Sequence, residues 1–122
     1  MNAGDTFIDG KYHHLWIILS DPVLDPDRVV IVNLTTHTID EESACILKKG
    51  DHPFVKHKTA VRYRDARITH LADLEKLRIA RLLASREPCS KSLLAKLRDG
   101  ASKDADLLPE ECRELLDEQG FI

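Results

Sequence analysis

The sequence predicts a mainly β fold, with a small β-barrel in the first half of the chain followed by two or three short α-helices. Three observations support this fold class. About the first 70 residues contain short apolar runs rich in β-branched residues and separated by Gly, Pro and Asp. Leucines then recur at helical spacing. The chain has 122 residues, of which 43% are hydrophobic, so it is long enough for one domain with its own core.

Five strands are expected in the first part of the chain, at residues 4–8, 14–20, 28–34, 43–47 and 59–68. The run from Val29 to Val32 is the clearest, because β-branched side chains favour a pleated, packed surface. The segment 21–27 contains Asp-Pro twice and predicts a turn. In the last strand, strict alternation places on one face Val61, Tyr63, Asp65 and Arg67. Five short strands followed by helices are typical of a small SH3-like barrel with helical additions.

Three helices are expected after the strands. Leucines at positions 71, 74, 77 and 83 predict a long helix with Asp73 as its N-cap. A second helix is expected to begin at Cys89-Ser90 and to end at Gly100. A third is expected to begin at Leu108-Pro109, because proline suits the first turn of a helix.

Charge is distributed unevenly along the chain, although the net charge is only −3. Residues 56–86 contain nine basic and three acidic residues, net +6, and such a local stripe can attract phosphates. A solvated face is the alternative interpretation. We expect residues 1–86 to form the barrel with its long helix, and residues 87–122 a helical extension with an acidic tail, within one domain.

The acidic tail, residues 99–122, contains two basic and eight acidic residues, net −6. Three interpretations are open for it. It is an interaction helix that docks a partner through Leu115 and Leu116, a segment that folds over the basic stripe, or an ordinary amphipathic helix with a solvated face.

Several classes of protein are not indicated. No apolar run approaches the ~18 residues of a membrane helix, and the N-terminus does not resemble a signal peptide. Cys45, Cys89 and Cys112 lie far apart and form no CxxC pair, so we expect reduced thiols in a cytoplasmic protein. The Gly-rich nucleotide-binding loops and the GxSxG elbow are missing from the sequence, and no cofactor is expected.

Candidate catalytic residues are histidines and hydroxyls near the ends of the predicted strands. Cleavage of RNA without metal needs a base for the 2′-hydroxyl proton, an acid for the leaving oxygen, and cations for the phosphorane charge. The residues that can supply the proton transfers and hydrogen bonds are His14, His52, His57, Thr35 and Thr36. A catalytic zinc site formed by His52, His57 and the His13-His14 pair is an alternative, although no HExxH motif is present.

Candidate RNA-binding residues lie in the basic stripe. The expected phosphate contacts come from Lys56, Lys58, Arg62, Arg64 and Arg67. Tyr63 lies among these arginines, where its ring is expected to stack on a base. Trp16 is expected in the core instead, because its neighbours are aliphatic.

Four short motifs, taken in order, resemble a known family. They are the opening Gly4-Asp5-Thr6-Phe7, the strand end Ile17-Ile18-Leu19-Ser20, the apolar strand from Val29 that ends in Thr35-Thr36, and Tyr63 to Ile68 with its Asp and Arg residues. Over about the first 70 residues the chain resembles the MazF/PemK/Kid type of toxin, the ribonuclease half of bacterial toxin–antitoxin pairs. The resemblance implies an SH3-like barrel that forms a homodimer, cleaves single-stranded RNA without metal, and is inhibited by a cognate antitoxin protein.

The resemblance also assigns site residues. Thr35 or Thr36 falls where the family keeps its active-site threonine, whereas His14-Leu15 stands where the family has a catalytic Arg followed by Pro. An imidazole can replace that arginine as acid or base, but it stabilises phosphorane charge less well than a guanidinium. This departure leaves a second hypothesis open, in which the barrel binds a protein partner or nucleic acid without catalysis.

Overall fold

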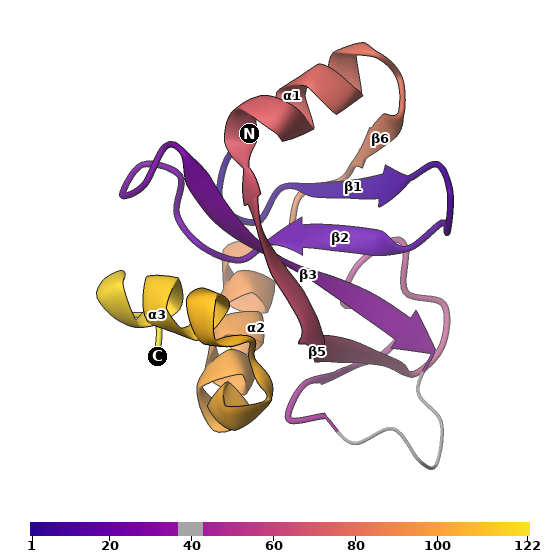
Figure 1. Ribbon diagram of the computed structural model, residues 1–122. Helices are drawn as coiled ribbons and strands as arrows, with labels where there is room; N and C mark the ends of the chain where they lie inside the picture. Colours follow the sequence, from indigo (N-terminus) through magenta and orange to yellow (C-terminus); the bar gives the residue numbers. More distant parts are fainter. Residues whose placement is uncertain (37–42) are drawn as a thin grey trace.

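The computed structural model describes residues 1–36 and 43–122, which form a curled antiparallel sheet with helices on both of its faces (Figure 1). The strands within these residues are β1 (Thr6–Asp9), β2 (Leu15–Ile18), β3 (Arg28–Thr36), β4 (Ile46–Leu47), β5 (Thr59–His70) and β6 (Leu83–Arg86). They pair in the order β4-β5-β3-β2-β1-β6, and the sheet curls into a half-barrel. The mainly β fold with short helices is therefore confirmed.

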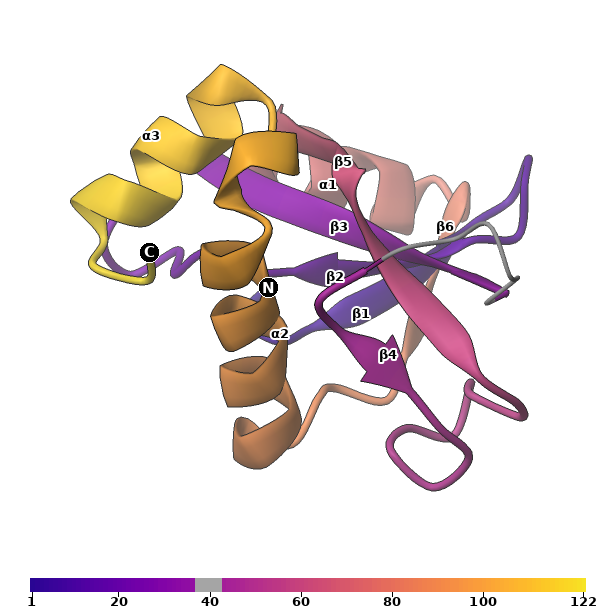
Figure 2. The same cartoon turned by 90° about the horizontal axis from the view of Figure 1, so that it is seen from below.

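The helices are α1 (Leu71–Ile79), α2 (Lys91–Lys103), the short 3-10 helix η1 (Ala105–Leu107) and α3 (Glu110–Glu118). Helices α2 and α3 cover one face of the sheet, which we call the inner face (Figure 2). The opposite face, which we call the outer face, carries α1 at one end. No helix in the described ranges is both long and apolar enough to cross a bilayer.

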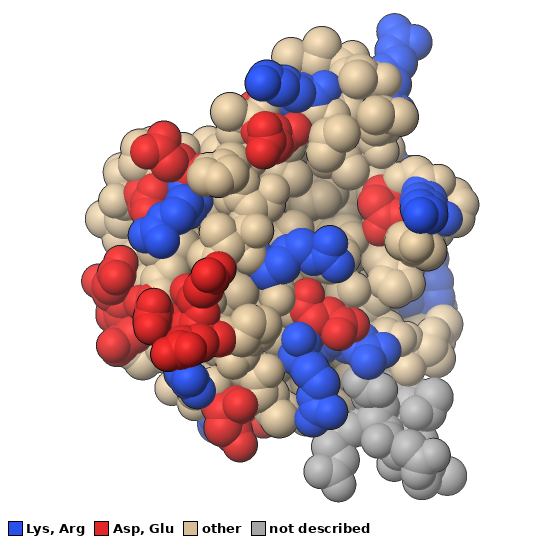
Figure 3. All heavy atoms as spheres, in the orientation of Figure 1, with Lys and Arg blue, Asp and Glu red and all other residues tan. Residues whose placement is uncertain are grey.

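The inner face holds the larger core. Alternate residues of the strands meet the apolar sides of α2 and α3 there, and the most deeply buried include Leu15, Ile17, Val30, Val32, Leu97, Leu115 and Leu116. Leu115 and Leu116 are 2% and 0% exposed, so they cannot dock a partner. Acidic side chains gather over α3 at the left of Figure 3 and do not fold over the outer face.

Gly100 lies inside α2 and does not end it as expected. A Cβ at this position would clash with the hydroxyl of Tyr63 and would lie 2.8 Å from the Cβ of Cys45. The glycine therefore permits α2 to approach the sheet closely, which is a tertiary requirement and not a helix-stop signal. The predicted start of this helix is confirmed, because the Ser90 hydroxyl accepts a hydrogen bond of 3.1 Å from the amide of Leu93.

The long helix expected over residues 71–84 is shorter in the structure. Helix α1 ends at Ile79, and Leu83 and Ala84 belong to β6, where they pair with Asp9 and Ile8 of β1. The edge of β1 offers unpaired backbone groups, and pairing with them outweighs the helical spacing of the leucines. Asp73 lies in the first turn of α1 and is not its N-cap, which is His70.

The side chains of β5 change the face to which they point partway along the strand. Asn33 lies opposite Arg62, whereas Ile31, two residues away, lies opposite Arg67. One residue of β3 therefore spans four residues of β5, and the alternation of β5 reverses at this bulge. As a result Tyr63 is buried on the inner face, while Arg67 lies on the outer face beside Ile31. The prediction of one shared face is wrong for the set Val61, Tyr63, Asp65 and Arg67.

Candidate functional site

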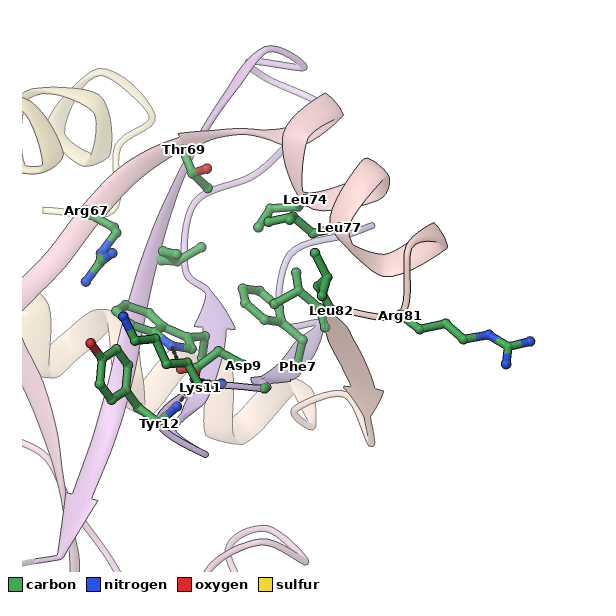
Figure 4. A pocket seen from close by; sticks show the side chains of 14 residues that line it. Phe7, Asp9, Lys11, Tyr12, Arg67, Thr69, Leu74, Leu77, Arg81 and Leu82 are labelled. Atoms are coloured by element: carbon green, nitrogen blue, oxygen red, sulfur yellow. Dashed lines mark hydrogen bonds between the residues drawn. The ribbon is translucent and has the colours of Figure 1, made fainter.

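The outer face contains a groove of about 550 Å³ between the β1–β2 hairpin and α1 (Figure 4). Its floor is apolar and aromatic, with Phe7, Trp16 and Ile31, and Leu74 and Leu77 of α1 form one wall. The remaining lining residues are Asp9, Gly10, Lys11, Tyr12, Arg67, Thr69, Arg81, Leu82 and Leu83. In the surface view this hollow has basic side chains around it (Figure 3).

Asp9 organises the hairpin at the edge of the groove. Its carboxylate accepts hydrogen bonds from the indole Nε1 of Trp16 at 2.9 Å and from the backbone amides of Lys11 and Tyr12. Partial burial raises the pKa of the Asp9 carboxyl, but the hydrogen bonds from Tyr12, Trp16 and Lys11 outweigh it and hold the pKa below the ordinary 3.8. The charged form of Asp9 therefore fixes both the loop and the orientation of the indole.

Lys11 and Arg67 border the groove, and neither has an ion-pair partner in the described residues. The guanidinium of Arg67 lies over the ring of Trp16, 4.6 Å from its centroid, and the ammonium of Lys11 lies 5.0 Å from the ring centroid of Tyr12. No salt bridge to a carboxylate is formed by either side chain within the described ranges. Positive charge on this face is thus available to an anionic ligand.

Next to the groove, the predicted site residue His14 contacts Asn33 of β3, on the face of that strand that also carries Thr35. Trp16 lies opposite Asn33, His14 directly precedes β2, and Thr35 follows Asn33 by two residues on the same face of β3. The amide Nδ2 of Asn33 donates to Nδ1 of His14 at 3.1 Å, so in this arrangement a neutral His14 ring carries its proton on Nε2. The Oδ1 atom of Asn33 is buried and has no hydrogen-bond partner among the described residues.

Arg62 adds a further charge to this row of residues. It pairs with Asn33 across the β3–β5 register, and its guanidinium forms an ion pair of 3.1 Å with Asp65. Because its chain neighbours Val61 and Tyr63 are buried on the inner face, Arg62 belongs to the outer face. One row across three strands therefore contains Trp16, Asn33 and Arg62.

His57 and Thr36 form a separate pair at the rim of the sheet. The Oγ1 of Thr36 lies 3.2 Å from Nε2 of His57, and both residues are exposed. Thr36 alternates with Leu34 of the inner core, so this pair lies on the opposite side of β3 from His14. Lys56 and Lys58 flank His57 and are exposed, as is Arg64 farther along β5. The structure thus brings together Thr36 with His57, and it places His14 beside Asn33 on the face of β3 that carries Thr35.

Two predicted site residues have structural roles instead. His52 is buried, its Nε2 donates to the carbonyl of Glu87 at 2.6 Å, and its Nδ1 accepts from the amide of Phe54, so neither ring nitrogen is open to substrate. Tyr63 is 1% exposed and its hydroxyl donates to the carbonyl of Leu97 at 2.6 Å, so its ring cannot stack on a base. Burial raises the pKa of the Tyr63 hydroxyl.

The alternative zinc site is not formed, because no three His, Cys, Asp or Glu side chains cluster as metal ligands in residues 1–36 and 43–122. His37 lies outside the described residues. The thiols are not arranged for nucleophilic chemistry either. Burial raises the pKa of Cys89 and of Cys112 to about 11, and it also raises that of Cys45, so all three are protonated at neutral pH.

The groove itself is the feature that sequence reasoning missed. Trp16 is nearly buried, as expected, yet its indole edge and its Arg67 neighbour line the hollow. A signal was present in the leucine-rich segment 71–83, which has more apolar positions than one helical face can bury. Leu77 and Leu82 remain 38% and 60% exposed and border the groove. Comparison of the chain with family models and with curated proteins finds no match.

Proposed function

We propose that this chain is a diverged toxin of the MazF/PemK type, which binds single-stranded RNA across the outer face of its sheet and cleaves it without metal. The observation that carries the proposal is the hydrogen bond of His14 to Asn33, with Thr35 two residues farther along the same face of β3 and with Arg62 and Arg67 also on that face. These groups match what metal-free RNA cleavage requires, namely a proton acceptor, a hydroxyl and cations.

In the proposed reaction, the side-chain amide of Asn33 turns over so that its Oδ1 accepts a hydrogen bond from Nδ1–H of His14. The unprotonated Nε2 of His14 then takes the proton of the ribose 2′-hydroxyl, and the 2′-oxygen attacks the adjacent phosphorus. The bond between phosphorus and the 5′-oxygen breaks, and the 5′-oxygen takes a proton from water. The products are a 2′,3′-cyclic phosphate and a 5′-hydroxyl. The hydroxyl of Thr35 donates to a phosphoryl oxygen, and the guanidinium of Arg62 stabilises the charge of the phosphorane.

In this proposal, Arg62 supplies the guanidinium that the family has at the position of His14. The family supplies a guanidinium from the second strand, where this chain has His14. Arg62 comes from β5 and reaches the same face through its pairing with Asn33. A histidine for proton transfer and an arginine for charge are therefore divided between two strands in the proposed site. A cognate antitoxin and a second copy of the chain are the partners that this proposal implies.

The test is cleavage of a mixed single-stranded RNA by the purified protein, with and without EDTA. We expect EDTA to have no effect and His14→Ala to lower the rate by about 10²-fold or more, the usual loss for a proton-transfer group. His70→Ala is the matched control, because this exposed histidine lies at the far end of β5. An all-deoxy substrate should not be cleaved, since it has no 2′-hydroxyl.

Two results would contradict this site. Full activity of His14→Ala with loss of activity in His57→Ala would move the chemistry to the Thr36–His57 pair at the rim. Cleavage that disappears in EDTA would exclude a metal-free reaction.

The second candidate function is RNA binding without cleavage. It is favoured by one observation, namely that His14 contacts Asn33 on the outer face while His57 contacts Thr36 on the other side of β3, so the described residues do not place these two histidines at one phosphate. Under this hypothesis the folded protein binds single-stranded RNA and leaves it intact, with His14→Ala binding as tightly as the parent chain.

A further inference from the structure

We infer that the groove between Trp16 and α1 receives one unpaired nucleobase of the bound RNA, and that it prefers a base with carbonyl acceptors, guanine or uracil. The inference rests on the proposed function and adds to it the source of base selectivity. The inference says which base binds near the cleaved phosphate and leaves the chemical steps of the cleavage unchanged.

The shape and lining of the groove suit a base. Its volume of about 550 Å³ exceeds what a single side chain fills, and its floor is built from Phe7 and Trp16. The guanidinium plane of Arg67 already lies on the indole, and a flat cation held on an aromatic ring is a surface on which bases stack. Apolar contact on the other side comes from Leu74, Leu77 and Leu82.

The polar edge of the groove supplies mainly hydrogen-bond donors. Figure 4 shows Arg67 and Thr69 on one side of the hollow and Lys11 on the other. The carboxylate of Asp9 is already engaged by Trp16 and by the hairpin amides. A donor-rich edge recognises acceptors, and arginine pairs with the O6 and N7 atoms of guanine in the same way. Where guanine has its O6 carbonyl and uracil its O4 carbonyl, adenine and cytosine have an amino group, which cannot accept a hydrogen bond from these donors.

The position of the groove places the base near the proposed cleavage site. His14 precedes Trp16 by two residues at the start of β2, and two residues of extended chain span about 7 Å. Stacked nucleotides rise by about 3.4 Å each, so the base in the groove lies within two nucleotides of the phosphate at His14. The groove and the cleavage site can therefore act on one RNA strand at once.

A protein segment is the competing occupant of an apolar groove. Lys11 and Arg67 have no ion-pair partner in residues 1–36 and 43–122, and their charges favour a ligand that carries an anion beside a flat ring, which describes a nucleotide. An acidic peptide is the expected ligand of the groove only if the protein does not bind RNA.

The experiment uses the emission of Trp16, which is the only tryptophan of the chain. The intact protein is titrated with 2′-O-methyl oligouridylate and with 2′-O-methyl oligoadenylate of equal length, neither of which can be cleaved. We expect oligouridylate to quench the emission, and oligoadenylate to bind at least about fivefold more weakly. Binding is followed in parallel by the anisotropy of a label on the oligonucleotide.

Matched variants separate the groove from general charge. Arg67→Ala and Leu82→Gln should abolish the quenching and the preference for uridylate. Their controls are Lys91→Ala, at the start of α2 on the inner side, and Val23→Gln, at an 84% exposed position outside the groove. Each control removes the same kind of group at a site remote from the hollow.

Two results would overturn the inference and are distinguishable. If labelled RNA binds but Trp16 emission does not change, and the groove variants bind like the parent chain, the base pocket is wrong while the proposed function stands. If neither RNA binding nor cleavage occurs, both proposals fall together, and an acidic protein segment becomes the expected occupant of the groove.

Discussion

The inner and outer faces of the sheet are built from the same strands but are completed differently. On the inner face, α2 and α3 cover the apolar side chains so fully that Leu97 and Leu116 are both 0% exposed. On the outer face, α1 covers only part of a smaller cluster, and Leu82 remains 60% exposed beside a groove with basic residues around it. The comparison indicates that stability resides on the inner face and that the outer face is available for a ligand.

The largest expected effect tests this division directly. Leu97→Ala should lower the free energy of unfolding by about 3 kcal/mol, within the usual range for a fully buried leucine, because it leaves a cavity in the inner core. Leu82→Ala, the matched change at the groove, should lower the free energy of unfolding by less than about 0.5 kcal/mol. Urea denaturation followed by circular dichroism measures both. Equal losses for the two variants would show that the outer face is part of the stabilising core.

A smaller effect is expected at the contact between α2 and the sheet. Gly100→Ala should destabilise the protein by about 1–3 kcal/mol, because its Cβ would collide with Tyr63 and Cys45. By helix propensity alone the same change would stabilise α2 by about 1 kcal/mol. The sign of the change in thermal denaturation therefore separates tertiary packing from local preference.

Measuring Gly100→Ala in a protein that also carries Tyr63→Phe tests the contact between these two residues. Removing the hydroxyl costs about 1 kcal/mol through the lost hydrogen bond to Leu97, but it opens space above Gly100. Gly100→Ala should be less damaging there than in the parent chain. Additive effects of the two changes would contradict the proposed contact.

The smallest effect concerns the hairpin at the edge of the groove. Asp9→Asn should lower the free energy of unfolding by about 1 kcal/mol at neutral pH, because an amide nitrogen cannot accept the hydrogen bond of the Trp16 indole. The pKa of Asp9 is lowered in the folded state, so its contribution is complete above the ordinary value of 3.8 and is lost as the pH falls through the folded-state value. Denaturation curves at several pH values should show the parent chain and the variant converging only in acid. A difference independent of pH would rule out the charged form as the cause.

Much of the fold was predictable because its determinants are local. The β-branched run in β3, the Ser90 cap of α2 and the proline before α3 each act within a few residues of the backbone that they order. The same holds for the basic character of β5 and the acidic character of α3, which follow from composition. The places of His14 and Thr35 at the ends of predicted strands also identify them as candidate site residues without any knowledge of which strands pair.

What the sequence by itself determined is therefore the set of elements and the residue types that they present. The tertiary structure decided which of those residues meet. The bulge in β5 moved Arg67 to the outer face, pairing with β1 converted Leu83 from helix to strand, and packing against Tyr63 made Gly100 an interior helix residue. These outcomes depend on partners that are far away along the chain, and no periodicity within one segment contains that information.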